Sequence, residues 1–99
     1  MLRDRPKRLD EAEAEAIAAR ALGFIAGDPE ELGRFLALTG IGPETIRAAA
    51  ADPAFLVGVL EYLLSNEPLL ISFAARENVR PTLIAAARHI LDGTAFGEA

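Results

Sequence analysis

Cysteine and tryptophan are both absent from the 99 residues of the chain. Without cysteine there is no disulfide framework, no thiolate nucleophile, no iron–sulfur cluster and no cysteine-type zinc site. The absence also fits a protein that works in a reducing compartment. We therefore expect a cytoplasmic localisation.

Long apolar runs are missing as well. A membrane-spanning helix needs roughly 18 consecutive apolar residues, and the best candidates, residues 35–43 and 53–60, are about half that length. The first eight residues are basic but are followed by acids, which is not the pattern of a signal peptide. We therefore expect a soluble protein that does not bind a membrane.

Side chains that carry out catalysis are scarce. His89 is the only histidine, and Ser65 and Ser72 are the only serines, neither of them in the context of a nucleophile elbow. Glu11 and Glu15 lie one helical turn apart, where acids complement a helix dipole. The Glu-x-x-His pairs of metal-binding bundles are absent. We predict that the protein is not an enzyme and has no catalytic, cofactor-binding or metal-binding residues.

Charge is distributed unevenly along the chain. Fifteen acidic and ten basic side chains give a formal charge of −5, but the first eight residues carry +3 and the remaining residues carry −8. A short basic segment of this kind binds phosphate or an acidic partner, or it is a solvated, frayed terminus. We predict a disordered basic arm at residues 1–9, a single helical domain at 10–93 and a frayed tail at 94–99.

Helical patterns fill most of the sequence. Apolar residues make up 52% of the chain, and 20 of them are alanine, which favours helix more than it builds a core. Capping residues followed by proline mark helix starts at Asp28-Pro29, Gly42-Pro43 and Asp52-Pro53. No segment shows convincing strand alternation. We predict an all-α compact bundle of about six short helices, at residues 11–26, 29–39, 43–50, 53–64, 67–77 and 81–91.

Particular residues are expected to shape the helix ends. Asp28 and Glu31 have the spacing of a capping box, in which each side chain accepts from the other residue's backbone N–H. Gly40 and Asn78 both tolerate the left-handed conformation that terminates helices. Gly93 is expected to end the last helix.

The helix predicted at residues 53–64 is apolar on nearly every side, with Glu61 as its only charge. A helix of this kind is central to the bundle or meets a partner. Three of its apolar residues lie off the main stripe. We predict Val57, Tyr62 and Leu64 as interface residues for an unidentified protein partner, with a homodimer as one form of that interaction.

The chain resembles itself at an offset of 38 residues. Residues 28–51 then align with 66–89, and seven of the 24 pairs are identical, including Phe35 with Phe73. Amphipathic helices inflate such matches, but the pattern describes two helix–turn–helix units. We predict a pseudo-twofold pair of helical hairpins joined by the central connector helix at 53–64.

The sequence Thr-Gly-Ile-Gly-Pro-Glu-Thr at residues 39–45 resembles the hairpin of helix-hairpin-helix DNA-binding domains, in which two such motifs flank a connector helix. The resemblance implies sequence-nonspecific DNA binding, because glycines expose backbone N–H groups that can hold a phosphate. Two features depart from that family's pattern. Glu44 stands where the family often has a basic residue, and the body of the chain is acidic. In the alternative interpretation, the turn only ends one helix and begins the next. The possible phosphate contacts are Gly40, Ile41, Gly42, Thr45 and Arg47.

A longer stretch, residues 13–91, resembles a bacterial family of small proteins known as domain of unknown function 3572. The resemblance rests on the sequences at 28–30, 35–37, 39–43, 52–56 and 66–70. Because that family has no assigned activity, the resemblance implies a small standalone protein and assigns no site residue. We expect a non-enzymatic helical protein-interaction or regulatory module, with nucleic-acid binding through the glycine turn as the alternative.

Overall fold

The computed structural model describes residues 9–96, in which every regular element is a helix. This confirms the all-α compact bundle of six helices that the sequence predicts. Most of the predicted basic arm, residues 1–8, and the last residues, 97–99, lie outside the described residues. The elements are α1 Glu11–Ala26, α2 Pro29–Thr39, the 3₁₀ turn η1 Pro43–Thr45, α3 Ile46–Ala49, α4 Pro53–Leu64, α5 Glu67–Glu77 and α6 Pro81–Phe96.

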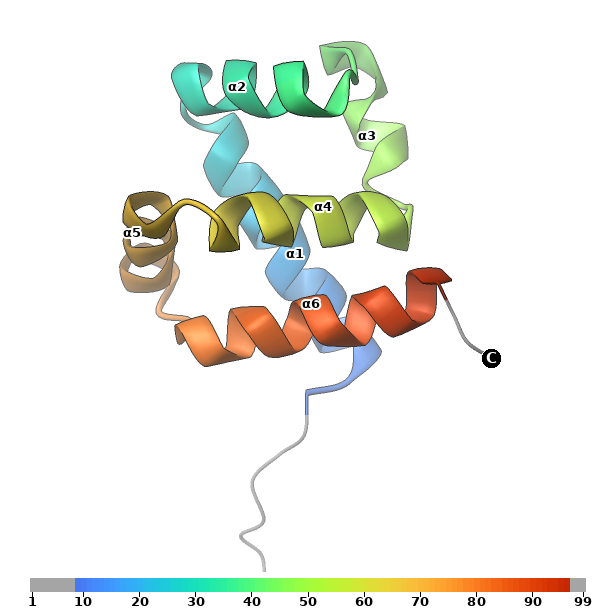
Figure 1. Ribbon diagram of the computed structural model, residues 1–99, viewed down its shortest axis with the longest axis vertical. Helices are drawn as coiled ribbons and strands as arrows, with labels where there is room; N and C mark the ends of the chain where they lie inside the picture. The colour runs from blue at the N-terminus through green and yellow to red at the C-terminus, as the bar shows by residue number, and fades with distance from the viewer. Residues whose placement is uncertain (1–8, 97–99) are drawn as a thin grey trace, which may run out of the picture.

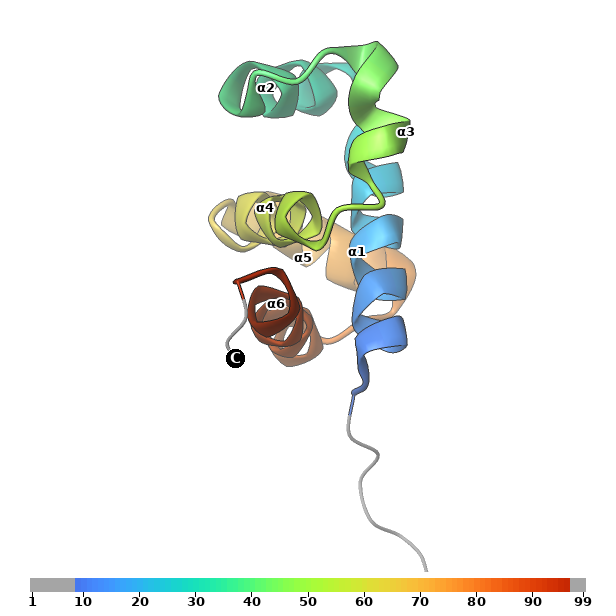
Figure 2. The same ribbon diagram turned by 90° about the vertical axis from the view of Figure 1, so that its right-hand side faces the viewer.

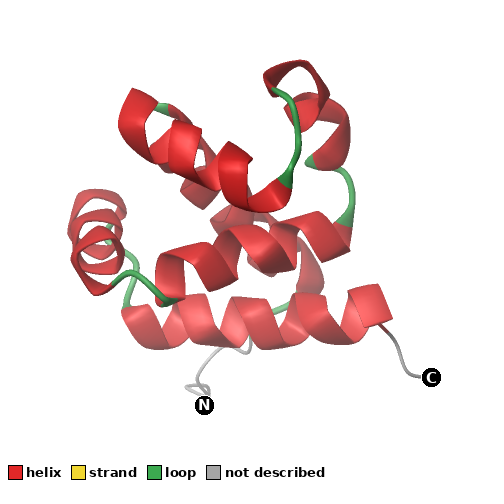
Figure 3. Cartoon of the chain, turned by 45° about the horizontal axis from the view of Figure 1, so that its top comes forward, coloured by secondary structure: helices red, strands yellow, loops and turns green. Residues whose placement is uncertain are grey.

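Three helices lie one above another and a fourth crosses all of them. α2, α4 and α6 form the stack, and α1 runs behind it (Figures 1 and 2). α5 lies at one side of the stack and α3 at the other, joined to their neighbours by short loops (Figure 3). The most extensive helix contacts are those among α1, α4 and α6. These three helices therefore form the centre of the molecule.

Small residues on α1 allow this central packing. Ala14, Ala18 and Ala21 have no exposed surface, and their short side chains let neighbouring helices approach closely. No polar or charged side chain is buried among the residues that the structure describes, so apolar packing holds their interior together. The largest fully buried side chains are Phe35, Phe73, Ile25, Leu60, Leu63, Ile84, Leu91 and Val59.

Side-chain caps begin the helices. The Glu13 backbone N–H donates to Asp10 Oδ1 at 2.8 Å, and the Asp10 N–H donates to Glu13 Oε1 at 2.9 Å. Asp28 and Asp52 accept hydrogen bonds from the first turns of α2 and α4. Each such cap is worth about 1 kcal/mol of helix stability. Residues close in sequence therefore set where these helices start.

The third helix is shorter than predicted. The sequence predicts one helix over 43–50, but Pro43–Thr45 forms a 3₁₀ turn and only Ile46–Ala49 is α-helical. Gly42 precedes the turn and makes no side-chain cap. The Thr45 N–H and hydroxyl both donate to the Gly42 carbonyl, at 3.0 and 2.9 Å. The backbone bond spans three residues and tightens this turn into 3₁₀ geometry.

The last helix is longer than predicted. Gly93 does not adopt the positive φ that terminates helices, and α6 continues to Phe96, so the start of the predicted frayed tail is helical. The Thr94 hydroxyl donates to the Ile90 carbonyl at 3.3 Å, and Ala95 packs against the core. Packing of this last turn outweighs the low helix propensity of glycine, which is about 1 kcal/mol.

The internal repeat holds in α2 and α5 and fails in the helices that follow them. Both helices have 11 residues, each buries one phenylalanine, Phe35 or Phe73, and each ends at a left-handed residue. Those residues are Gly40, with φ of 74°, and Asn78, with φ of 57°. The next helices differ, because α3 has four residues and α6 has sixteen. α4 connects two hairpins as predicted, but the pair is unequal.

Candidate functional site

The turn after α2 contains the residues that the sequence identifies as candidate phosphate contacts. Gly40 ends α2, and its N–H donates to the Leu36 carbonyl at 2.8 Å. Ile41 is half-buried, and its N–H donates to the Thr39 hydroxyl at 3.3 Å. Both N–H groups are therefore used within the turn.

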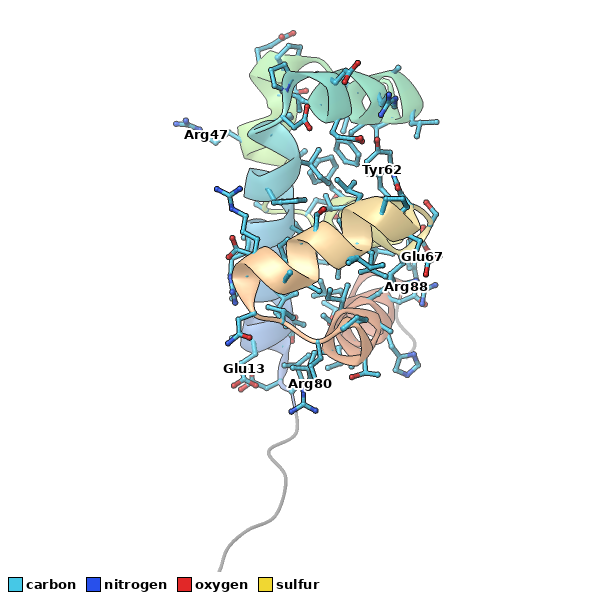
Figure 4. All side chains as sticks on the ribbon, turned by 90° about the vertical axis from the view of Figure 1, so that its left-hand side faces the viewer. Glu13, Arg47, Tyr62, Glu67, Arg80 and Arg88 are labelled. Carbon is cyan, nitrogen blue, oxygen red and sulfur yellow. The ribbon has the colours of Figure 1, made fainter. Side chains whose placement is uncertain are left out.

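A carboxylate lies against the third residue of the turn. A Cβ placed on Gly42 would come within 2.8 Å of Glu44 Oε2, so the Glu44 side chain covers this glycine. Thr45 uses its hydroxyl within the turn, and Arg47 points away from the body of the molecule (Figure 4). A phosphate at Gly42 would meet a negative charge first, which opposes binding.

The three residues predicted for an interface lie in different environments. Val57 is 4% exposed and belongs to the core, so its assignment to a free interface is wrong. The reason is that α4 lies among α1, α5 and α6, which cover most of its sides. Leu64 is half-buried and packs against the core. Tyr62 lies between α4 and α2, near the surface (Figure 4).

Tyr62 connects α4 to α2 through both its ring and its hydroxyl. The ring packs edge-on against Phe35 with 5.4 Å between the ring centres, and the hydroxyl donates to Glu31 Oε1 at 2.7 Å. Glu31 Oε2 accepts from Arg34 Nη1 at 2.8 Å. Only one half of the predicted capping box forms. The Glu31 N–H donates to Asp28 Oδ1 at 3.4 Å, whereas the Glu31 carboxylate turns toward Tyr62 and Arg34.

Burial raises the pKa of the Tyr62 phenol above its ordinary value of 10.0, and the hydrogen bond to Glu31 raises it further. An ionised phenol would lose this donor and place a second negative charge beside the carboxylate. The phenol therefore stays protonated at neutral pH and keeps its hydrogen bond across the gap between the two helices.

A cleft of about 300 Å³ opens between α2 and α4 beside this tyrosine. Leu38, at its α2 side, is 73% exposed, whereas Phe35 is buried at its base. Of its lining residues, the sequence points only to Tyr62, because Leu38 and Gly58 come together only where α2 and α4 face each other. The cleft is lined by Phe35, Leu38 and Thr39 of α2 and by Gly58, Glu61, Tyr62 and Ser65 of α4.

A larger groove of about 1120 Å³ lies between α1 and α5. Arg20 crosses it, donating from Nε to Glu77 Oε1 at 3.1 Å and from Nη2 to the Glu77 carbonyl at 2.7 Å. Asp28 and Arg76 also line the groove. Because both signs of charge are mixed there and Arg20 is already bound, the groove does not indicate one class of ligand.

The described side chains most suited to catalysis or metal binding do not form a site. His89, the only histidine, is exposed on α6. Within residues 9–96, no group of three or more His, Cys, Asp and Glu side chains is placed to hold a metal ion.

Over the described part of the chain, no single helix is long and apolar enough to cross a lipid bilayer. α4 and α5 reach the required length only when taken together, and they are bent by 106° where they meet.

One protein-family model matches most of the chain. Residues 11–94 match the family model described as "Protein of unknown function (DUF3572)". The chain belongs to the DUF3572 family. This confirms the longer of the two resemblances seen in the sequence. No curated protein and no solved structure is a significant match, and the helix-hairpin-helix resemblance stays a prediction.

Proposed function

We propose that this DUF3572 protein is a non-enzymatic interaction module of the cytoplasm. In this proposal the cleft between α2 and α4 receives one large apolar side chain from a helical segment of a partner protein. The observation that carries the proposal is the glycine at the α4 side of the cleft.

Gly58 lies in the middle of α4, where glycine lowers helix stability by about 1 kcal/mol relative to alanine. The usual structural reasons for a glycine do not apply to it. Its φ is not positive, and an added Cβ would meet nothing within 4 Å. Gly58 instead keeps the cleft open beside Tyr62. A residue that breaks a local rule without an internal gain fits a contact with something outside the fold.

The cleft favours a single side chain as its occupant. Its volume, about 300 Å³, is at the lower limit for pockets that enclose small molecules. Phe35, Leu38 and Tyr62 offer apolar contacts, and Glu61, whose side chain is 53% exposed, lies at the edge. An apolar anchor on a helix is the usual element recognised by such grooves.

Charge favours a basic partner segment. The chain contains fifteen acidic and ten basic side chains, which gives a formal net charge of −5. Long-range attraction would therefore steer a basic segment toward this surface and slow the approach of an acidic one. The partner element that we propose is a basic amphipathic helix.

Two further observations support the other parts of the proposal. No described polar side chain is buried, whereas catalytic groups with shifted pKa values commonly lie in desolvated sites. The absence of cysteine supports a reducing compartment.

Site-specific photocrosslinking in the native cell tests the proposal. A photoreactive phenylalanine analogue replaces Leu38 in the full chain, and we expect one discrete adduct with another protein. Gly58→Leu fills the cleft and should remove that adduct. Gly33→Leu is the matched control, because Gly33 also lies within a helix and has open space but does not line this cleft.

Three outcomes contradict the proposal. The first is the absence of any adduct from position 38. The second is an adduct that persists in Gly58→Leu, provided that circular dichroism shows this variant to be folded. The third is an adduct with the mass of two copies of the chain, which would make the occupant a second copy.

A further inference from the structure

Residues 28–52, which contain α2, η1 and α3, are attached to the molecule differently from the other helices. We call residues 28–52 the arm, which is separate from the basic segment predicted at residues 1–9, and we call α1, α4, α5 and α6 the base. Phe35 is the only buried residue in the arm. Ile46 and Ala50 are partly buried against the core. The arm therefore contributes little to the interior apart from one ring.

The arm reaches α4 mainly through aromatic rings. The backbone of α2 lies close to that of α1 over several residues but not to that of any other helix, and α3 lies close in this way only to η1. Phe35 contacts the edge of Phe55 with 5.7 Å between ring centres and that of Tyr62 with 5.4 Å. The Tyr62 hydroxyl also joins α4 to α2 through its hydrogen bond to Glu31. By contrast, the Asp52 side chain accepts from the Ala54 N–H only where the arm runs into α4.

The base is packed independently of the arm. α1, α4 and α6 contact one another extensively. α5 is fixed by Phe73, which is fully buried and lies edge-on to Phe24 of α1 with 5.4 Å between ring centres. Removing the arm from its place would therefore uncover the aromatic cluster but would leave the contacts within the base intact.

We infer that the arm opens as a unit while the base stays folded, and that the hydrogen bond from Tyr62 to Glu31 is the latch that holds it closed. Regions with few buried apolar contacts open at lower free energy than the core around them. Opening moves the α2 wall away from α4 and widens the cleft beside Gly58. Control of partner access by this opening rests on the proposed function, whereas the opening itself does not.

Native-state hydrogen exchange on the full chain tests the inference, with mass spectrometry resolving each helix. In the wild-type protein we expect the amides of α2 and α3 to exchange at least about tenfold faster than those of α4 and α6. Tyr62→Phe removes a hydrogen bond to a carboxylate and should speed exchange of the arm about tenfold. Amides that exchange by complete unfolding should accelerate by the same factor, because complete unfolding also breaks the latch.

The decisive variant lies in the base. Ile84 is fully buried in α6, and it stays packed when only the arm opens. Ile84→Val should therefore speed exchange in α4 and α6 about threefold to tenfold and leave the arm unchanged. Glu31→Gln is the second latch variant, used if Tyr62→Phe does not fold. It keeps an acceptor for the Tyr62 hydroxyl but removes the charge that strengthens the bond, so it should speed exchange of the arm by a smaller factor than Tyr62→Phe.

Equal exchange rates in arm and base would overturn the inference, since they describe one cooperative unit. Acceleration of the arm by Ile84→Val as large as that of the base would do the same. The latch is overturned if neither Tyr62→Phe nor Glu31→Gln affects the arm. These results are independent of the crosslinking outcome, so failure of the proposed function and failure of the arm are distinguishable.

Discussion

The two hairpins on either side of α4 begin from similar sequences and acquire different structural roles. α2 and α5 have the same length and bury one phenylalanine each. After α5, three residues of α6 enter the core, namely Ile84, Ala87 and Leu91. After α2, the four-residue α3 buries none. The two hairpins therefore differ most in their second helix: the long α6 joins the core, whereas the short α3 does not.

The turns of the two hairpins show the same contrast at smaller scale. The Val79 N–H donates to the Ala74 carbonyl at 3.0 Å, and Val79 is 6% exposed. The corresponding Ile41 donates to a side chain, the Thr39 hydroxyl, and is only half-buried. The α5–α6 turn is therefore fixed to the core by an apolar residue, whereas the α2–η1 turn is closed mainly by its own polar groups.

The largest expected difference between the hairpins concerns their matched phenylalanines. Phe73→Ala should lower the free energy of unfolding by about 3–5 kcal/mol, as for other buried aromatic residues. Phe35→Ala should cost less, because opening of the arm limits the loss to the free energy that holds the arm closed. Urea denaturation followed by circular dichroism measures both, and equal losses would contradict the comparison.

The left-handed residues give the next largest difference. Gly40→Ala forces a side chain into positive φ and should cost about 1–2 kcal/mol of stability. Asn78→Ala should cost less, because Asn78 already has a side chain in this conformation. Asn78→Gly should be neutral or stabilising. Thermal unfolding of the three variants checks the order, and an Asn78→Ala loss equal to that of Gly40→Ala would refute it.

Stabilising substitutions at two helical glycines, one in the arm and one in the base, should affect hydrogen exchange of the arm differently. Gly33 in α2 and Gly93 in α6 both have open space for a Cβ, so alanine at either should add about 1 kcal/mol to global stability. Only Gly33→Ala should slow hydrogen exchange in the arm, since α6 stays helical when the arm opens. Slower arm exchange in Gly93→Ala would argue against separate opening.

The smallest expected effect is a loss of stability at alkaline pH, when the Tyr62 hydroxyl of the latch ionises. Because the pKa of Tyr62 is raised by burial and by Glu31, the stabilisation linked to its proton is complete below about pH 10 and is lost as pH rises through the higher pKa of the folded state. Tyr62 is the only tyrosine and there is no tryptophan, so phenolate absorbance follows this group alone. Glu31→Gln should lower its pKa, and an unchanged titration would contradict the latch.

Local signals made most helix boundaries predictable. Asp28 and Asp52 accept from the first turns of their helices, and Gly40 and Asn78 end theirs in the left-handed conformation. These interactions join residues within a few positions of one another, so the sequence contains them in full. The end of α6 was not predictable in this way, because packing of Ala95 against distant residues carries the helix past Gly93.

The candidate site was less predictable than the fold. A position off the main apolar stripe of α4 predicts Tyr62 as an interface residue, but the same criterion predicts Val57, which is buried. The spacing of Asp28 and Glu31 correctly predicts that Asp28 caps α2, but the bond from the Glu31 carboxylate to Tyr62 spans 31 positions and has no local signal. Leu38 and Gly58 form part of a cleft only because α2 faces α4 in the folded chain.

Caps, glycines and apolar periodicity act over one or two helical turns. They therefore make the chain helical, set where most of its helices begin and end, and select the residues that turn left-handed. Contacts between distant segments place α6 in the core and leave α3 outside it, cover Val57, and bring Glu31 to Tyr62 across the cleft. These outcomes depend on which apolar surfaces meet, and burial of such surface is shared among residues far apart in the chain.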